Sequence, residues 1–155
     1  MHESFAKYVD SLHASFERLV NMAPVKIEDL RKPLPEKCIY LFSENGMALY
    51  VGRTNHFRQR MRQHSIDASQ HNQAVFAFRL ARAETGKTIA DYSKEGSRSA
   101  LLRDKQFANA FQRAKARIRD MELRYVEETD PLRQALLEIY VAVVLRTMHN
   151  DFETH

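Results

Sequence analysis

The sequence predicts an α+β fold in which a small, mainly antiparallel sheet is flanked by helices. Two strand-like runs, 37–43 and 47–52, meet at Glu44-Asn45-Gly46, and Asn-Gly between such runs is a strong hairpin signal. Apolar residues at helical spacing occupy residues 5–20, and an apolar segment spans Ala135–Leu145. A length of 155 residues fits one domain, here residues 1–155, that can bury a core without disulfides.

The chain is expected to begin with an amphipathic helix, within an N-terminal extension over residues 1–30. Its apolar positions are Phe5, Tyr8, Val9, Leu12, Phe16, Leu19 and Val20. Pro24 ends this helix, and Pro33 and Pro35 mark an extended loop before the hairpin. The aromatic stripe suits either the core or the surface of a homodimer.

A short helix over His56–His64 is expected directly after the hairpin. Thr54 or Asn55 can cap it, because a side-chain oxygen at either position accepts hydrogen bonds from first-turn amides. Arg60 and His64 lie four positions apart and therefore share one face of this helix.

The next segments predict a strand, a loop and a basic helix. Apolar and less apolar residues alternate over Ala74–Arg82, which predicts a third strand. A polar loop from Glu84 through Gly96 follows, and we expect it to be partly mobile without substrate. A helix from about Ser99 to Arg119 comes next, so that residues 84–120 form a basic insertion.

Two further elements complete the predicted fold. Met121, Leu123 and Tyr125 alternate as in a strand. Asp130 is a helix cap followed by a first-turn proline, Pro131, which together open the apolar helix over 135–145.

Charge and cysteine content restrict the function classes. The net charge of +4 and pI near 9.3 are modest, but Gly52–His64 carries four arginines without an acid, and Arg98–Asp120 carries seven basic residues against two acids. Such stretches favour a polyanionic partner, although a solvated helix face explains the second equally well. The single cysteine, Cys38, excludes an internal disulfide, and no signal peptide or membrane-spanning run is recognised, so we expect a cytoplasmic protein without a membrane partner.

Glu138 is the only charged residue within Ala135–Leu145. A lone carboxylate among apolar side chains is costly unless a cation meets it. A metal ion would meet it, and so would an arginine such as Arg60 or Arg146.

These motifs together resemble the GIY-YIG nuclease superfamily. The resemblance rests on Cys38-Ile39-Tyr40, Tyr50-Val51-Gly52, Arg60, His64, Glu138 and Asn150. It covers about residues 37–80 and the chain from Asp130 onward, with Cys38 standing where the family name has glycine.

The resemblance implies an endonuclease that uses Mg²⁺ or Mn²⁺ to cleave DNA, leaving a 5′-phosphate and a 3′-hydroxyl. Tyr40 would act as general base toward water, and Tyr50 would help to position that water or the phosphate. Arg60 would bind phosphate oxygens, His64 would orient the water, and Glu138 would hold the metal. Asn150 would maintain the geometry of the site through hydrogen bonds.

The basic residues nearby are candidates for contacts with nucleic acid. They are Arg53, Arg58, Arg62, Arg113, Lys115 and Arg117. DNA is preferred over RNA as the partner, and a homodimer through the N-terminal helix would let two sites reach both strands. The alternatives are a non-catalytic DNA-binding module on the same fold and an RNA-cleaving nuclease. A zinc site built from His64, His149 and His155 matches no known ligand spacing.

Overall fold

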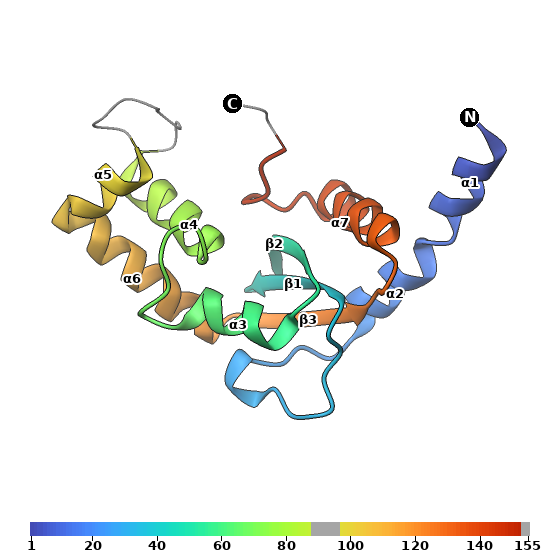
Figure 1. The fold of residues 1–155 in the computed structure, drawn as a ribbon, viewed down its shortest axis with the longest axis horizontal. Coiled ribbons are helices and arrows are strands. Elements are labelled where there is room, and N and C mark those ends of the chain that lie inside the picture. Colours follow the sequence, from blue (N-terminus) through green and yellow to red (C-terminus); the bar gives the residue numbers. More distant parts are fainter. Residues whose placement is uncertain (88–96, 153–155) are drawn as a thin grey trace. The chain divides into compact units, whose positions relative to one another are not determined.

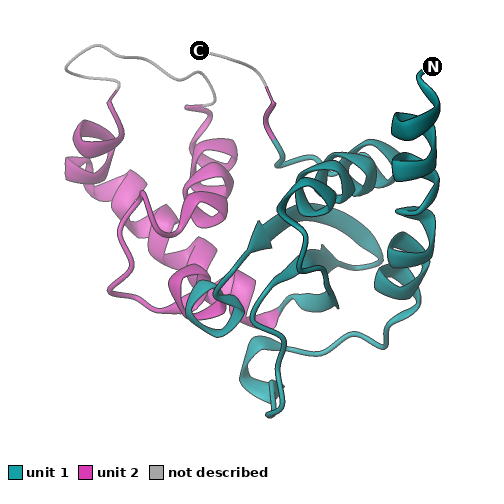
Figure 2. Ribbon diagram, turned by 45° about the vertical axis from the view of Figure 1, so that its right-hand side comes forward, with its two compact units in different colours: residues 1–60, 121–150 teal, residues 61–120, 151–155 magenta. Residues whose placement is uncertain are grey.

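The structure is a computed structural model that describes residues 1–87 and 97–152. The chain divides into two compact units (Figure 2). The first contains Met1–Arg60 and Met121–Asn150, and the second contains Met61–Asp120 and the chain from Asp151. The second unit therefore begins well before the predicted basic insertion over residues 84–120.

The first unit is built on a three-stranded antiparallel sheet in the order β2-β1-β3. Its strands are β1 (Cys38–Glu44), β2 (Met47–Thr54) and β3 (Glu122–Glu127). Asn45 and Gly46 join β1 to β2 with φ values of 51° and 76°, the left-handed conformations that a two-residue hairpin turn needs. The α+β class, the hairpin and the strand predicted at 121–125 are confirmed.

The N-terminal segment forms two helices where the sequence predicted one. They are α1 (Glu3–Asp10) and α2 (His13–Asn21), followed by a 3₁₀ turn, η1 (Ile27–Asp29). Phe16 and Leu19 of α2 are buried in the core, whereas Phe5 of α1 is 50% exposed. The aromatic stripe is therefore divided between the core and the surface.

Helix α7 (Pro131–Leu145) packs with α2 on one face of the sheet (Figure 1). The core between them is apolar and includes Phe16, Ile39, Val51, Leu137 and Val141. The predicted start of this helix is confirmed, because Asp130 is the N-cap, its side chain accepts from the Arg133 amide, and Pro131 occupies the first turn.

Helix α3 (Phe57–Ser65) belongs to the opposite face of the sheet and confirms the helix predicted after the hairpin. Its Phe57 is buried, with ring centroids 6.4 Å from Tyr40 and 4.7 Å from Tyr125. Thr54 acts just before the helix, where its Oγ1 accepts from the His56 amide at 3.0 Å. Packing of Phe57 therefore determines where the first turns of α3 lie.

The predicted third strand at Ala74–Arg82 is wrong, because this segment forms α4 (Val75–Thr85) in the second unit. Phe76, Ala77, Leu80 and Ala81 are all buried, and their spacing follows a helical face. The alternation of apolar and less apolar residues was too weak to distinguish a strand from a buried helix.

The basic helix is present but broken. It forms α5 (Arg98–Arg103) and α6 (Lys105–Asp120), and Asp104 ends the first and caps the second by accepting from the Phe107 amide at 2.9 Å. Glu84 and Thr85 of the predicted polar loop belong to α4, and residues 88–96 lie outside the described part of the chain. Within the described residues, no helix is long and apolar enough to cross a membrane.

Candidate active site

Tyr40 and Gly52 face each other across the β1–β2 hairpin. A Cβ atom on Gly52 would lie 2.4 Å from both Cζ and Oη of Tyr40. No larger residue fits there unless the phenol moves. The close packing of Tyr40 therefore requires glycine at position 52 of the Tyr50-Val51-Gly52 motif.

Tyr40, Tyr50 and Arg60 form a cluster on the α3 face of the sheet. The two phenol rings have centroids 6.4 Å apart, and their residues are 1% and 8% exposed. Nε of Arg60 donates to Oη of Tyr40 at 3.1 Å. These three side chains, which come from two strands and one helix, therefore lie together.

The protonation of this cluster follows from its burial. Burial raises the pKa of Tyr40 well above its ordinary value, Tyr50 adds to this shift, and the hydrogen-bonded Arg60 opposes it. Burial lowers the pKa of Arg60, but Tyr40 and Tyr50 outweigh that effect and raise it. Near neutral pH Tyr40 is therefore a neutral phenol beside the guanidinium cation of Arg60.

Glu138 lies on α7 and pairs with Arg53. Its Oε2 is 3.0 Å from Nε of Arg53, and the Arg53 and Glu138 side chains are 48% and 20% exposed. The sequence named Arg60 and Arg146 as ionic partners and did not name Arg53 as one.

The two parts of the candidate site meet at β2, the edge strand. Arg53 pairs in register with Ile39, so it points to the α7 face, whereas Gly52 and Tyr40 belong to the α3 face. Glu138 is nevertheless near enough to contribute to the raised pKa of Tyr40. The carboxylate of Glu138 and the phenol of Tyr40 therefore influence each other electrostatically.

Asn150 binds the free edge of β2. Its Oδ1 accepts from the Val51 amide at 2.9 Å, and its Nδ2 donates to the Val51 carbonyl at 2.7 Å. The carboxamide thereby takes the place of a neighbouring strand beside the residue that separates Tyr50 from Gly52. It is not a helix cap, because Arg146 is the C-cap of α7.

Sequence reasoning missed Gln134, which lies on α7 and is 3% exposed. Its Nε2 donates to the Glu128 carbonyl at 2.7 Å and to Asn55 Oδ1 at 3.2 Å. These bonds connect α7 to the end of β3 and to the loop that leads into α3. The signal in the sequence was a polar carboxamide, Gln134, just before the apolar segment of this helix.

Two of the candidate residues, His64 and Lys115, are buried. His64 is 0% exposed, and its ring packs against Phe76. Lys115 is also 0% exposed, and its ammonium donates to the carbonyls of Asp67 and Ser69 at 2.8 and 2.5 Å. The loop carbonyls thus satisfy the charge of Lys115, which is not available to a phosphate.

The other predicted contacts with nucleic acid remain at the surface. Arg58, Arg62, Arg113 and Arg117 are all exposed. Arg113 pairs with Glu84 at 2.5 Å.

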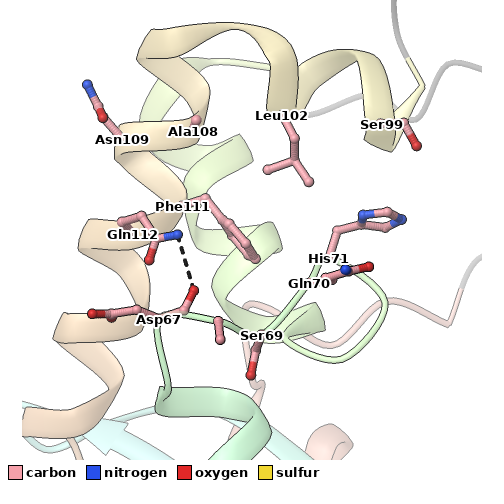
Figure 3. Close-up of a pocket in the computed structure, with 11 residues that line it drawn as sticks. Asp67, Ser69, Gln70, His71, Ser99, Leu102, Ala108, Asn109, Phe111 and Gln112 are labelled. Atoms are coloured by element: carbon pink, nitrogen blue, oxygen red, sulfur yellow. Dashed lines mark hydrogen bonds between the residues drawn. The ribbon is translucent and has the colours of Figure 1, made fainter.

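The second unit contains a cavity of about 470 Å³ beside α6 (Figure 3). Polar side chains such as Gln70, His71 and Asn109 line it together with Leu102 and Phe111. None of the candidate catalytic side chains lines this cavity.

The described residues contain no group of three or more His, Cys, Asp or Glu side chains that could hold a metal ion. The family resemblance assigns a divalent cation to the carboxylate of Glu138. That donor suits Mg²⁺, which keeps several of its waters and takes phosphate oxygens as further ligands.

Comparison with known proteins supports the sequence resemblance. A family model described as the GIY-YIG catalytic domain matches residues 36–149. This range begins just before β1 and includes all of α7, so it contains Tyr40, Tyr50, Arg60 and Glu138. A search of curated proteins found no match, and neither did a search of solved structures.

Proposed function

This chain belongs to the GIY-YIG nuclease family, and on that premise we propose that it is a divalent-metal-dependent endonuclease acting on DNA. Water would attack the phosphorus atom and the P–O3′ bond would break, leaving a 5′-phosphate and a 3′-hydroxyl. The observation that carries this proposal is the Tyr40–Arg60 pair packed over Gly52.

Arg60 is the residue we propose to stabilise the transition state. Its planar guanidinium can bind two phosphate oxygens, and it stays charged at any pH of interest. Its Nε donates to Tyr40, and this hydrogen bond orients the guanidinium within the cluster. Removal of one preorganised hydrogen-bond donor to the transition state lowers the rate about 10²–10³-fold in other enzymes.

Tyr40 is the residue we propose to accept the proton of the attacking water. In the free protein it is a neutral phenol, because burial holds its pKa well above the ordinary value. It can accept a proton only after positive charge beside it favours the phenolate, and Arg60 supplies part of that charge. We propose that Tyr50 helps to position the water or the phosphate.

Glu138 is the residue we propose to hold Mg²⁺, or Mn²⁺ in its place. Such an ion would supply the remaining positive charge near Tyr40 and would stabilise the leaving oxygen. Glu138 would have to release Arg53, whose side chain is 48% exposed and could then bind the substrate phosphate. Asn150 would keep β2 in place through Val51 while this exchange occurs.

A DNA-binding module without turnover is the second candidate, and two observations favour it. The Glu138–Arg53 ion pair already satisfies the carboxylate, and the raised pKa of Tyr40 opposes its use as a base. This candidate predicts salt-sensitive DNA affinity without cleavage by any divalent ion.

The test is a plasmid-nicking assay in Mg²⁺ or Mn²⁺, with single-stranded DNA and structured RNA as parallel substrates. We expect Glu138→Gln and Tyr40→Phe each to lower the rate by about 100-fold or more. The matched control is Glu84→Gln, which removes an ion-paired carboxylate from the second unit and should leave the rate unchanged. Equal rates in all four proteins would refute the assignment, and cleavage of RNA alone would replace the substrate.

A further inference from the structure

The cavity of about 470 Å³ in the second unit combines apolar and polar side chains (Figure 3). Leu102 of α5, Phe111 of α6 and His71 from the loop before α4 surround the same space. Cavities of roughly 300–1,000 Å³ with this mixture hold small organic ligands. The exposed carboxamides that line it offer both donors and acceptors, as the edge of a nucleobase requires. These carboxamides belong to Gln70, Asn109 and Gln112.

Two cations of α6 hold the loop that forms one wall of this cavity. Lys115 donates to the carbonyls of Asp67 and Ser69 at 2.8 and 2.5 Å. The same ammonium lies 4.2 Å from the centroid of the Phe111 ring. Arg119 pairs with the Asp67 carboxylate at 3.1 Å. The wall is therefore formed before a ligand arrives, and a preorganised site loses little conformational entropy on binding.

Two arginines lie beside this cavity, around one aromatic ring. The ring belongs to Phe78 of α4, and its centroid is 6.2 Å from that of His71 and 6.0 Å from that of Phe111. Cζ of Arg82 is 5.2 Å from the Phe78 centroid, and Cζ of Arg98 is 5.6 Å from it. Phe78 thus connects the residues that line the cavity to both guanidiniums.

Within residues 61–87 and 97–120, no acidic side chain forms an ion pair with Arg82 or Arg98. Burial lowers the pKa of Arg82, and the charge of the nearby Arg98 lowers it further. An anion that binds both guanidiniums would remove this repulsion. Acids of the same segment are paired with other cations, as Glu84 with Arg113, Asp104 with Lys87, and Asp67 with Arg119.

The charge of this part of the chain also indicates an anionic ligand. Residues 61–120 contain twelve Lys and Arg against six Asp and Glu, whereas the whole chain contains 24 against 20. The excess positive charge of the protein therefore lies in this segment, which forms most of the second unit. A cluster of basic residues in one part of a protein is typical of nucleic-acid binding.

From these observations we propose that the cavity holds an unpaired base of a DNA strand, while Arg82 and Arg98 bind a phosphate next to that base. A base that is already unpaired costs least to take out of the stack, and a protein receives it through hydrogen bonds to its edge and apolar contacts with its faces. The inference rests on the proposed function for the identity of the ligand. It uses no residue of the Tyr40–Arg60 cluster, so binding can be measured apart from cleavage.

The first test measures DNA binding by the full chain in EDTA, where cleavage does not occur. Fluorescence anisotropy compares a duplex that carries one bulged adenine with the same duplex that carries a stable abasic analogue at the bulge. Both duplexes have the same backbone, so the ratio of their Kd values reports the base alone. Contacts between a base and aromatic side chains are worth about 1–3 kcal/mol, so we expect the adenine duplex to bind about tenfold more tightly.

A variant that fills the cavity should abolish this preference. Ala108 lines the cavity and is half-buried, so Ala108→Trp should make the two Kd values equal. The matched control is Ala116→Trp, which changes another half-buried alanine of α6 that does not line the cavity and should keep the preference. Circular dichroism confirms that both variants are folded.

The second test concerns the two arginines. Arg82→Gln and Arg98→Gln should each weaken binding of both duplexes and reduce the slope of log Kd against log salt concentration by about 1. The matched control is Arg103→Gln, which removes one exposed charge from α5 and should weaken binding by no more than about twofold because salt screens distant charges. Equal effects of all three variants would overturn the assignment of the phosphate to Arg82 and Arg98.

Equal binding of the two duplexes by the wild type, or an unchanged preference in Ala108→Trp, would overturn the proposal. Displacement of the adenine duplex by micromolar deoxyadenosine monophosphate would assign the cavity to a free nucleotide, and a base preference found only with bulged RNA would reject DNA. Plasmid nicking in Mg²⁺ without a base preference would remove this site and keep the proposed nuclease. A base preference without nicking would keep this site and remove the nuclease.

Discussion

Replacement of Gly52 by alanine tests the central packing relation of the candidate site. The new Cβ would lie 2.4 Å from Cζ and Oη of Tyr40 and 3.0 Å from its Cε1, about 1 Å closer than an ordinary contact allows. Tyr40 is 1% exposed and packs against Phe42 and Phe57, so the ring has little room to move.

The magnitude follows from that geometry. Overpacking of a filled core costs about 1–3 kcal/mol. Displacement of the phenol would also weaken its hydrogen bond from Arg60, at a cost of about 1 kcal/mol. Lower entropy of the unfolded chain returns roughly 0.4–1 kcal/mol. We therefore expect Gly52→Ala to lower the free energy of unfolding by about 1–3.5 kcal/mol.

Urea denaturation followed by circular dichroism measures this change. In a Tyr40→Ala background the clash is removed, so Gly52→Ala should there cost less than about 0.5 kcal/mol. Gly46→Ala is a control for backbone strain without a steric clash. No atom lies within 4 Å of its added Cβ, so any loss of stability there comes from its φ of +76°. A loss below about 0.5 kcal/mol for Gly52→Ala in the wild-type background would refute the packing argument.

Three further predictions concern other residues of the fold and the site. Asn150→Ala should lower stability by about 1–2 kcal/mol and speed hydrogen exchange at the Val51 amide. The control Asn109→Ala should change neither quantity. An unchanged exchange rate at the Val51 amide in Asn150→Ala would contradict the contact with the edge of β2. Because the pKa of Tyr40 is raised in the folded state, its contribution to stability is present below pH 10 and lost as the pH rises above that value. Urea midpoints measured from pH 9 to 11.5 should therefore fall more steeply in the wild type than in Tyr40→Phe, and equal slopes would count against the shift. Lys115→Met should lower stability by about 1–3 kcal/mol without changing DNA affinity at a fixed salt concentration, because the Lys115 ammonium is bound by loop carbonyls. Arg117→Gln should weaken DNA binding and leave stability unchanged. If Lys115→Met instead weakened DNA binding and left stability unchanged, Lys115 would be a contact with nucleic acid.

Local signals predicted several elements well because each acts within a few residues. Asn45-Gly46 adopts the left-handed conformations that the hairpin needs, and Asp130 caps α7 through an amide three residues away. The strand predicted over 74–82 was wrong because local signals do not include distant contacts. Its residues pack against α6, a helix more than twenty positions downstream. A periodicity argument cannot detect burial on several sides by a distant element.

The sequence by itself determined the hairpin, the capped start of α7, and the family resemblance carried by Tyr40, Tyr50, Arg60, His64, Glu138 and Asn150. Tertiary structure alone decided that Arg53 is an ionic partner of Glu138, that Asn150 binds the edge of β2, and that His64 and Lys115 are buried. The physical reason is the range of the interactions. Turns and caps are made by neighbours in the chain, whereas the partner of a charge and the burial of a side chain depend on which distant segments pack together.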